Sequence, residues 1–492
     1  MSGACATLRR VTDRRDPSPV ADGRIDRGLT ADDLVAAAGG VLLARSDRPI
    51  LGGAVDSREV RPGNLFVALP GERTDGHRFV SAALAAGAAG VIVSTLPDDV
   101  DPASVDTTIL AVPDPLLALQ AIASAWRRRY DPLVVGITGS IAKTSTKEAV
   151  ATVLGAAMPT LKNEGNLNNE IGLPLTVLRL RSEHRAAVLE MGMYVGGEIA
   201  DLARIGRPEI GIVTAVHPVH LSRIGTIEAI EQAKGELVEA LPEDGVAILN
   251  ADDERVRRMA SRTRAQVVTY GFAPDADVRA EAVVSRGADG MTFELVADGE
   301  RTSVAIPTLG RMAVHNALAA AAAGRAAGLP VEVIVDALGL GWSAPHRSQV
   351  VRAAGLTIVD DAYNASPGSV AAALELIAGL PGRRIAVLGE MLELGSEHES
   401  GHRQAGEAAA ALVDRLVVVG DGARGIAAGA IAAGLDPAAV SMVAGRADAL
   451  EVLRRDLTAG DVVLVKASRG VALDLLVDDL VAALGGPETT AR

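Results

Sequence analysis

The sequence predicts an α/β protein of three units, in which helices cover mainly parallel sheets. A chain of 492 residues is too long for one core, because domains average about 150 residues. Hydrophobic residues make up 49% of the chain, which is enough to give each unit an interior. Short apolar runs alternate with helical segments, as in doubly wound sheets. We therefore expect ligands beyond the carboxyl ends of the strands.

Composition excludes several classes of protein. A net charge of −14 argues against a general nucleic-acid or anionic-membrane binder. No apolar run approaches the ~20 residues that span a bilayer, and Cys5 is the single cysteine, so no intramolecular disulfide is expected. Residues 1–28 are rich in arginine and aspartate and lack the apolar segment of a secretion signal. We expect a cytoplasmic protein with a flexible N-terminal extension, without membrane insertion or a nucleic-acid partner.

The first unit runs from residue 30 to about residue 95. Apolar spacing predicts helices over 31–38 and 79–86, and turns around Pro62-Gly63 and Pro70-Gly71 separate short strands. Polar residues gather near these turns, where they serve either as turn caps or as a binding site: Ser57, Arg58, Asp75 and His77.

A phosphate loop opens the second unit, after a helix predicted over 114–128. The apolar run 133–137 leads into Thr138–Thr144, and a helix can continue over 145–154. In such a turn, backbone N–H groups and the helix dipole attract phosphate. Lys143 would reach the β- and γ-phosphates and Thr144 would bind Mg²⁺. The loop therefore indicates a nucleoside triphosphate.

The strict phosphate-loop pattern is not met, which leaves an ordinary strand-to-helix turn as the alternative. The pattern requires glycine where this chain has Ile137 and Ala142. Gly139 still provides one flexible position. Ala142 fits if its φ is negative, because a positive φ penalises a Cβ atom.

Lysine is rare in this chain. Only five of the 48 basic residues are lysines, namely Lys143, Lys147, Lys162, Lys234 and Lys466. A site that needs a compact ammonium or an amine cannot use the guanidinium of arginine. Each lysine is thus a candidate for chemistry, with Lys162 the first choice for a residue without such a role.

Alternating strands and helices continue through the second unit and predict a parallel sheet. The strands are expected at 133–138, 186–190, 210–215, 245–249 and 266–271. Glu190 ends the second of these and is a candidate Mg²⁺ ligand. His217 and His220 follow the third, and Lys234 lies on a helix predicted over 227–241, where a solvated face is the simpler interpretation.

The third unit repeats the alternation, with strands at 356–360, 384–388, 414–419 and 461–466. Residues 420–425 satisfy the pattern G-x-G-x-x-G after a strand. No acidic residue ends the next strand, 440–443, to hold a ribose. The pattern is therefore a weak indication of a dinucleotide site.

Short motifs between residues 30 and 485 together resemble those of one enzyme family. In the first unit they are Asp56-Ser57-Arg58, residues 62–66 (PGNLF) and Asp75-Gly76-His77. The second unit has TGSIAKTSTKE at 138–148, GNLNNEIG at 165–172 and Glu190-Met191-Gly192, and Pro345-His346-Arg347 follows. The third has DDAYNASP at 360–367, GEMLELG at 389–395 and VKASR at 465–469. Their order resembles that of the Mur ligases of peptidoglycan synthesis, most closely the dipeptide-adding MurF type.

The resemblance implies three domains and a set of site residues. The domains are a uridine-nucleotide-binding domain over 29–115, a central ATP-binding domain over 116–340, and a Rossmann-like domain over 341–492 that binds ATP and dipeptide. ATP would contact Gly139, Ser140, Ile141, Ala142, Lys143, Thr144, Ser145, Asn316, Arg347 and Asp361. The other substrates would contact Ser57, Arg58, Asp75, His77, Asn169, Tyr363, Asn364, Lys466 and Ser468. Two Mg²⁺ ions would be held by Thr144, Glu190, His220 and a carbamylated Lys234. The catalytic set would be Lys143, Glu190, His220 and Lys234.

The implied activity is ADP-forming amide ligation. A carboxylate of UDP-N-acetylmuramoyl-tripeptide would attack the γ-phosphate of ATP, and the amine of D-alanyl-D-alanine would displace phosphate from the acyl phosphate. The resemblance further implies a monomer whose third domain closes over the site.

This chain departs from the family pattern at three places. Ile141-Ala142 replaces Asn-Gly, Met312-Ala313 replaces His-Asn, and Ser366 replaces Asn. Because the candidate catalytic residues are all retained, we expect an active enzyme. The alternatives are a Mur ligase that adds a diamino acid, whose Asp-Asn-Pro-Arg pattern is missing; a folylpolyglutamate synthase, against which the first unit argues; and a catalytically silent nucleotide-sugar-binding relative.

Overall fold

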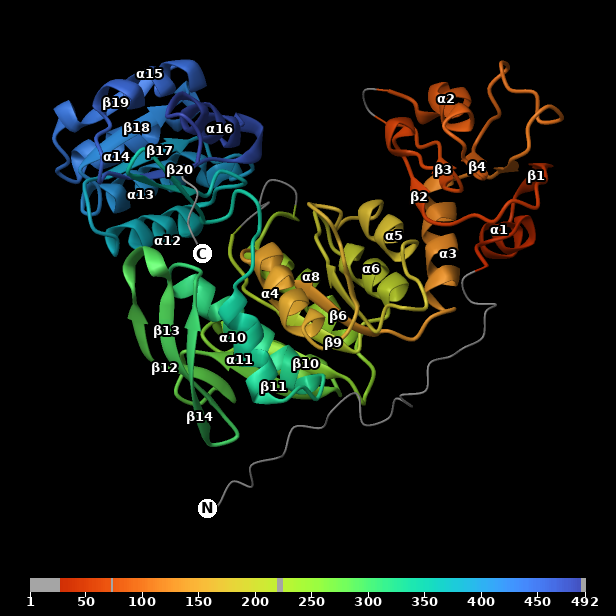
Figure 1. Ribbon diagram of the computed structural model, residues 1–492, viewed down its shortest axis with the longest axis horizontal. Helices are drawn as coiled ribbons and strands as arrows, with labels where there is room; N and C mark the ends of the chain where they lie inside the picture. Colours follow the sequence, from red (N-terminus) through yellow and green to blue (C-terminus); the bar gives the residue numbers. More distant parts are fainter. Residues whose placement is uncertain (1–26, 72–73, 219–223, 488–492) are drawn as a thin grey trace.

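Three sheets, each with its own helices, make up the computed structural model, which describes residues 27–71, 74–218 and 224–487. In Figure 1 the first unit (red to orange) and the third (blue) stand apart on either side of the central unit (yellow to green). Most of the predicted extension 1–28, and the candidate ligand His220, lie outside the described residues.

The first unit is a five-stranded sheet in the order β1-β5-β4-β3-β2, with only β1 antiparallel to its neighbour. Its strands are β1 (Val41–Ala44), β2 (Gly53–Ala54), β3 (Leu65–Val67), β4 (Gly90–Val93) and β5 (Thr108–Ala111), and its helices are α1 (Ala31–Ala38), α2 (Val80–Ala85) and α3 (Pro115–Arg127). The predicted helix 31–38 is confirmed, because Thr30 and Asp33 form a capping box at its first turn.

The central unit is a nine-stranded sheet in the order β14-β13-β12-β11-β10-β9-β6-β8-β7. The strands are β6 (Leu133–Thr138), β7 (Thr160–Lys162), β8 (Ala186–Glu190), β9 (Ile210–Val213), β10 (Val246–Asn250), β11 (Gln266–Gly271), β12 (Val278–Ser285), β13 (Met291–Ala297) and β14 (Glu300–Ile306). Its helices are α4 (Lys143–Gly155), α5 (Gly172–Val177), α6 (Glu198–Gly206), α8 (Ile227–Glu239), α9 (Glu254–Arg258), α10 (Arg311–Ala326) and α11 (Val331–Leu340).

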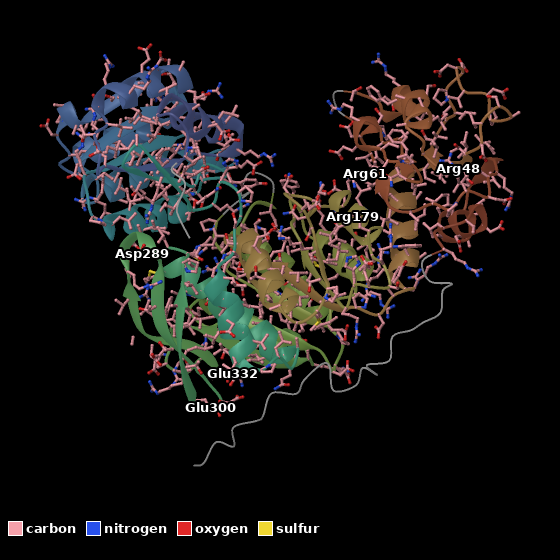
Figure 2. All side chains as sticks on the ribbon, in the orientation of Figure 1. Arg48, Arg61, Arg179, Asp289, Glu300 and Glu332 are labelled. Atoms are coloured by element: carbon pink, nitrogen blue, oxygen red, sulfur yellow. The ribbon has the colours of Figure 1, made fainter. Side chains whose placement is uncertain are left out.

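The expectation of an entirely parallel central sheet is wrong at one edge. Strands β6 to β12 run parallel to their neighbours, but β13 and β14 are antiparallel. The turn between β13 and β14 is Asp298-Gly299, and both residues have positive φ, as a tight hairpin turn requires. The turn between β12 and β13 reaches the third unit, where Asp289, labelled in Figure 2, lies 3.7 Å from Arg352.

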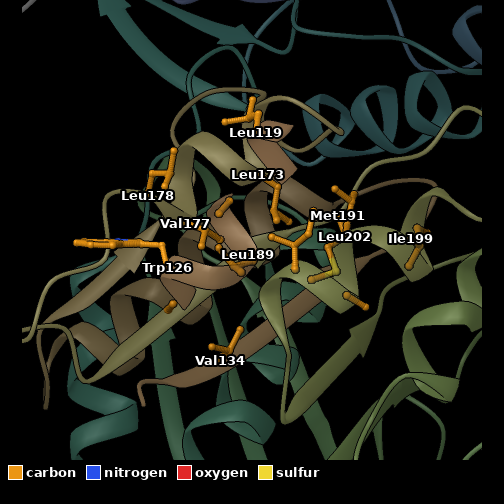
Figure 3. Packing of buried hydrophobic residues seen from close by; sticks show 14 of the residues in the cluster. Leu119, Trp126, Val134, Leu173, Val177, Leu178, Leu189, Met191, Ile199 and Leu202 are labelled. Atoms are coloured by element: carbon orange, nitrogen blue, oxygen red, sulfur yellow. The ribbon is translucent and has the colours of Figure 1, made fainter. Parts of the chain in front are cut away.

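Helix α3 connects the core of the first unit with that of the central unit. Leu119 and Trp126 on α3 belong to the same buried cluster as Leu173 and Val177 of α5 (Figure 3). Trp126 also donates a hydrogen bond from Nε1 to the carbonyl oxygen of Leu180, at 3.2 Å. A second buried cluster of the central unit includes a run of alanines on α10. Their small side chains allow α10 to pack closely against α4.

The third unit is a six-stranded sheet in the order β15-β16-β20-β17-β18-β19, with only β15 antiparallel to its neighbour. Its strands are β15 (Gln349–Ala353), β16 (Leu356–Asp360), β17 (Arg384–Gly389), β18 (Arg415–Val419), β19 (Val440–Val443) and β20 (Val462–Lys466). Its helices are α12 (Pro367–Ala378), α13 (His398–Ala410), α14 (Arg424–Ala432), α15 (Arg446–Asp456) and α16 (Asp474–Ala483). Within the three described ranges, every helix is too short or too polar to cross a membrane.

Candidate active site

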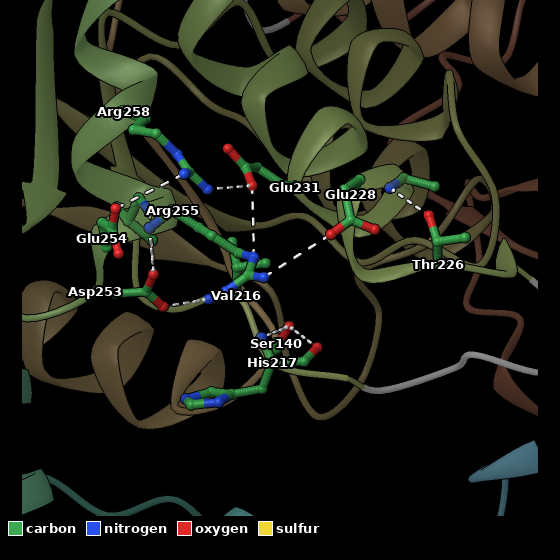
Figure 4. Close-up of polar contacts among 12 residues, drawn as sticks. Ser140, Val216, His217, Thr226, Glu228, Glu231, Asp253, Glu254, Arg255 and Arg258 are labelled. Carbon is green, nitrogen blue, oxygen red and sulfur yellow. Dashed lines mark hydrogen bonds and ion pairs between the residues drawn. The ribbon is translucent and has the colours of Figure 1, made fainter. Parts of the chain in front are cut away.

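The phosphate loop joins β6 to the N-terminus of α4 and is fixed by the end of β9. Gly139 has a φ of +149°, and a Cβ atom there would lie 1.8 Å from the Thr214 hydroxyl oxygen, so glycine is required. Thr214 Oγ1 donates to the carbonyl oxygen of Ile141 at 2.6 Å. Ser140 Oγ accepts from the His217 N–H at 2.9 Å and donates to the His217 carbonyl oxygen at 3.0 Å (Figure 4). The loop is therefore pre-formed at the carboxyl end of the sheet.

Ala142 does not meet the condition expected of it. Its φ is +63°, in the left-handed region, so the condition under which alanine fits this position without strain is not met. Ala142 is the N-cap residue at which α4 begins, and its carbonyl oxygen accepts the first helical hydrogen bond, from the Thr146 N–H at 2.9 Å. A Cβ atom in this region costs about 1 kcal/mol, a strain that glycine would not have.

A cavity of about 940 Å³ lies beyond the strand ends, between the central and third units. Of the predicted site residues in the central unit, it is lined by Ser140, Ile141, Ala142, Lys143, Thr144, Ser145, Asn169, Glu190, Lys234 and Asn316. From the third unit it is lined by Arg347, Asp361, Tyr363, Asn364, Lys466 and Ser468. The structure thus brings together candidates that are more than 300 residues apart in the sequence, with Gly139 next to them in the loop.

Glu190 ends β8 with a carboxylate that is only 2% exposed. Its Oε1 accepts a hydrogen bond from Asn168 Nδ2 at 2.7 Å, whereas its buried Oε2 has no hydrogen-bond partner among the described residues. An unpaired buried carboxylate oxygen is costly unless a cation satisfies it. The residues here fit Mg²⁺, which commonly takes one or two carboxylates and completes its shell with phosphate oxygens and water. In the described ranges, no group of three or more His, Cys, Asp or Glu side chains offers an all-protein cage.

Two lysines, Lys143 and Lys234, line the same cavity as Glu190. Lys143 donates from Nζ to the carbonyl oxygen of Gly139 at 2.7 Å. Burial lowers its pKa, and the charge of Glu190 opposes that shift. Lys234, on α8, is 3% exposed, and burial followed by the charge of Lys143 holds its pKa well below the usual value. No described residue forms a hydrogen bond or ion pair with its side chain, so Lys234 is a buried amine with depressed basicity.

A flat, partly aromatic surface forms another wall of the cavity. Asn316 on α10 holds its Oδ1 against the Thr146 hydroxyl at 3.0 Å. The guanidinium carbon of Arg311 lies 4.0 Å from the ring centre of Phe272, and the imidazole of His315 meets the same ring edge-on at 4.7 Å. Such planar groups suit a purine base.

Sequence reasoning missed part of this wall. His315 is itself fixed by Asp252, whose Oδ2 lies 2.9 Å from its Nε2. Phe272 directly follows the expected strand 266–271, and Asp252 lies three residues after the expected strand 245–249, at the sheet edge where ligands were predicted. The positions of these strand ends could therefore have identified them.

The third unit contributes a network of charged and aromatic groups. Lys466, 3% exposed at the end of β20, pairs with Asp361 and donates to the Asn364 carbonyl oxygen at 2.9 Å. The guanidinium of Arg347 lies 4.0 Å from the Tyr363 ring centre. Arg469, which was also missed, donates to the Tyr363 hydroxyl at 3.1 Å and lines the cavity.

The first-unit candidates do not line this cavity, and their contacts lie within their own unit. Arg58 pairs with Asp56, which holds the pKa of that carboxyl at about 2. His77 Nδ1 lies 2.6 Å from Asp75, and its Nε2 accepts from the Ser94 N–H at 2.9 Å. These contacts stabilise turns. A role for Ser57, Arg58, Asp75 and His77 in binding stays a prediction.

The glycine-rich pattern at 420–425 is filled by protein. A Cβ atom on Gly422 would lie 2.2 Å from the carboxyl carbon of Glu390, so that side chain occupies the space beside the loop. The pattern does not contribute to the cavity.

Comparison with known proteins follows the same three units. The Mur ligase family, catalytic domain matches residues 51–127, the Mur ligase middle domain matches 137–324, and the Mur ligase, glutamate ligase domain matches 346–469. The chain is 37% identical over 437 residues to UDP-N-acetylmuramoyl-tripeptide--D-alanyl-D-alanine ligase of Bacillus subtilis, covering 88% of this chain and 93% of the relative. The chain belongs to the Mur ligase family.

Further relatives and solved structures support the assignment of this chain to the Mur ligase family. The enzyme of the same name from Escherichia coli is 40% identical over 372 residues, covering 74% of this chain and 80% of its own. MurF from Acinetobacter baumannii superposes with a TM-score of 0.81 at 30% identity, covering 92% of this chain and 98% of that one. MurF from Thermotoga maritima, solved with ADP, gives 0.78 at 28% identity, covering 88% and 98%. The predicted family and three-domain α/β architecture are confirmed, and this Mur ligase uses ATP.

Proposed function

We propose that this Mur ligase joins D-alanyl-D-alanine to UDP-N-acetylmuramoyl-tripeptide with conversion of ATP to ADP and phosphate, during peptidoglycan precursor synthesis in the cytoplasm. The names of the relatives and their coverage of the chain support this activity. The observation that carries it is the single cavity in which Lys143 and Glu190 of the central unit face Lys466 of the third. We propose the boundaries 29–115, 116–340 and 341–492 for its domains, and a monomeric enzyme.

The chemistry follows from the charges around the cavity. The carboxylate of the tripeptide attacks the γ-phosphorus of ATP, ADP leaves, and an acyl phosphate forms. The amine of D-alanyl-D-alanine then attacks the acyl carbon, phosphate leaves, and the amine loses a proton. Carboxylate and triphosphate repel one another, so the N-terminus of α4, Lys143 and Arg347 lower the barrier by offsetting negative charge.

The free Oε2 of Glu190 and the Thr144 hydroxyl are the groups that would hold Mg²⁺ beside the phosphates, with His220 and a carbamylated Lys234 for a second ion. Bound Mg²⁺ supplies positive charge that stabilises the transferring phosphoryl group. The depressed pKa of Lys234 supports carbamylation, because CO₂ reacts with the neutral amine. After addition of ¹³C-labelled bicarbonate, the wild type should show a carbamate NMR signal that the Lys234→Met variant lacks. Identical spectra for the two proteins would exclude the modification.

Closure of the third unit over the central unit would complete the site and exclude water. Small-angle scattering should show a smaller radius of gyration with an ATP analogue and the nucleotide substrate together. The absence of compaction would count against closure.

Phosphate release tests the function. It should require ATP, UDP-N-acetylmuramoyl-tripeptide and D-alanyl-D-alanine together, and it should stop when any one is omitted. A catalytically silent relative would release none. A diamino-acid-adding enzyme would instead respond to a diamino acid with the dipeptide nucleotide.

A further inference from the structure

Lys147 is a rare lysine that the proposed reaction leaves without a role. Lys143, Lys234 and Lys466 line the cavity, and the Lys162 side chain is 43% exposed. Lys147 is fully buried and does not line the cavity. A buried ammonium persists only with good partners, so its contacts indicate what it does.

The Lys147 ammonium connects α4 with the strand beside Glu190. Its Nζ donates to the carbonyl oxygen of Asn163 at 2.7 Å and lies 3.0 Å from Glu148 Oε1. Asn163 directly follows β7, which pairs with β8, and is 1% exposed. Lys147 also lies one helical turn after Lys143 on α4, so its position is tied to that of the phosphate loop.

Asn163 in turn holds the backbone of Glu190 on both sides. Its Oδ1 accepts from the Glu190 N–H at 2.8 Å, and its Nδ2 donates to the Glu190 carbonyl oxygen at 3.1 Å. The same Nδ2 donates to the Leu167 carbonyl oxygen at 2.7 Å. Leu167 precedes Asn168, the residue that donates to Glu190 Oε1. Both the backbone and the carboxylate of Glu190 are therefore positioned through Asn163.

We propose that Lys147 and Asn163 are positioning residues that set the Glu190 carboxylate at a fixed place relative to the phosphate loop. The ammonium suits this role because it is compact, whereas the larger guanidinium used elsewhere in the chain would not fit a fully buried contact to one carbonyl. The inference rests on the proposed function only in that Glu190 binds the divalent cation of the nucleotide.

The test measures cation binding and not turnover. Mn²⁺ is used as a spectroscopic substitute for Mg²⁺, and its binding to the protein with ADP is followed by electron paramagnetic resonance. Lys147→Met should weaken Mn²⁺ binding by about 10- to 100-fold, the usual effect of losing a group that orients a metal ligand. ADP binding without cation should be unchanged. The matched control is Lys162→Met, which removes the other cation paired with Glu148 but takes away none of the hydrogen bonds that Asn163 makes with Lys147, Leu167 and Glu190; it should bind Mn²⁺ like the wild type.

A second variant keeps the test decisive if Lys147→Met does not fold. Asn163→Ala retains the backbone carbonyl that Lys147 contacts and removes only the bonds to Glu190 and Leu167. It should weaken Mn²⁺ binding similarly, and the double variant should be no worse than either single variant, because both act through Glu190. The proposal would be overturned if a folded variant bound Mn²⁺ as tightly as the wild type does. It would also be overturned if a variant lost ADP binding without cation as strongly as it lost Mn²⁺ binding. If the variants weaken Mn²⁺ binding as expected but the wild-type enzyme does not ligate the proposed substrates, the proposed function is overturned and this inference stands.

Discussion

Lys143 donates a hydrogen bond to the carbonyl oxygen of Gly139, four residues earlier in its own phosphate loop, at 2.7 Å. The ammonium therefore has a partner on the protein, although it lines the cavity with Glu190. For the proposed reaction, Lys143 must exchange this carbonyl for phosphate oxygens when ATP binds. A charged phosphate is the stronger acceptor, so the exchange is favourable.

Lys143→Met removes the ammonium that offsets charge during phosphoryl transfer. We expect phosphate release to fall by about 10²- to 10³-fold, the usual effect of removing one such group. Lys143→Arg should restore little activity, because guanidinium has a different shape. Lys162→Met serves as the control and should keep wild-type activity. Comparable activity in Lys143→Met would exclude Lys143 from the reaction.

Ala142→Gly replaces the strained residue at the start of α4. The positive φ of Ala142 costs about 1 kcal/mol, whereas glycine adopts this conformation freely but costs about 0.5–1 kcal/mol in added chain entropy. We expect the melting temperature to stay equal or to rise. A clear fall, measured by calorimetry, would show that the methyl group makes stabilising contacts that outweigh the strain.

Arg469→Gln tests recognition of the incoming dipeptide. Arg469 lines the cavity beside Tyr363 and has no carboxylate partner among the described residues, whereas Lys466 is paired with Asp361, so Arg469 is a cation available for the dipeptide carboxylate. The KM for D-alanyl-D-alanine should rise roughly ten- to hundredfold, with the KM for ATP unchanged. Arg424→Gln, at an exposed arginine outside the cavity, is the control. Equal activity on the dipeptide and its amide in the wild type would contradict this role.

The buried His402 predicts a loss of stability in acid. Its Nε2 accepts from the Met391 N–H. Burial lowers its pKa below 6.5, and the hydrogen bond to the His398 carbonyl oxygen and the charge of Glu390 only partly oppose that shift. As the pH falls below 6.5, the unfolded chain binds a proton that the folded chain does not, so the free energy of unfolding falls. Denaturant unfolding across this range should show a shallower pH dependence for His402→Gln. An identical slope would assign the effect to other groups.

Local patterns predicted much of the fold. The helix 31–38 and the strands 133–138, 186–190 and 266–271 match the structure because capping and apolar periodicity act over a few residues. Strands β12 to β14 were missed, although the Asp298-Gly299 hairpin turn is visible in the sequence. Their alternating pattern lies beyond Gly271, where only helices and parallel strands were expected.

The site was predictable where one chain segment defines it. The strand end identified Glu190, and the loop identified Lys143. The positive φ of Ala142 could not be read from residue types, because it follows from how α4 meets β6. Arg469 and the Lys147–Asn163 contact depend on how separate segments pack together, and no local pattern reports that.

Transfer of ¹⁸O from the tripeptide carboxylate to phosphate is the most direct test of the central claim. With UDP-N-acetylmuramoyl-tripeptide labelled in that carboxylate, each turnover should release one phosphate carrying one ¹⁸O atom, because the carboxylate oxygen bridges to phosphorus in the acyl phosphate. Phosphate released without ¹⁸O while the peptide bond forms would contradict the account.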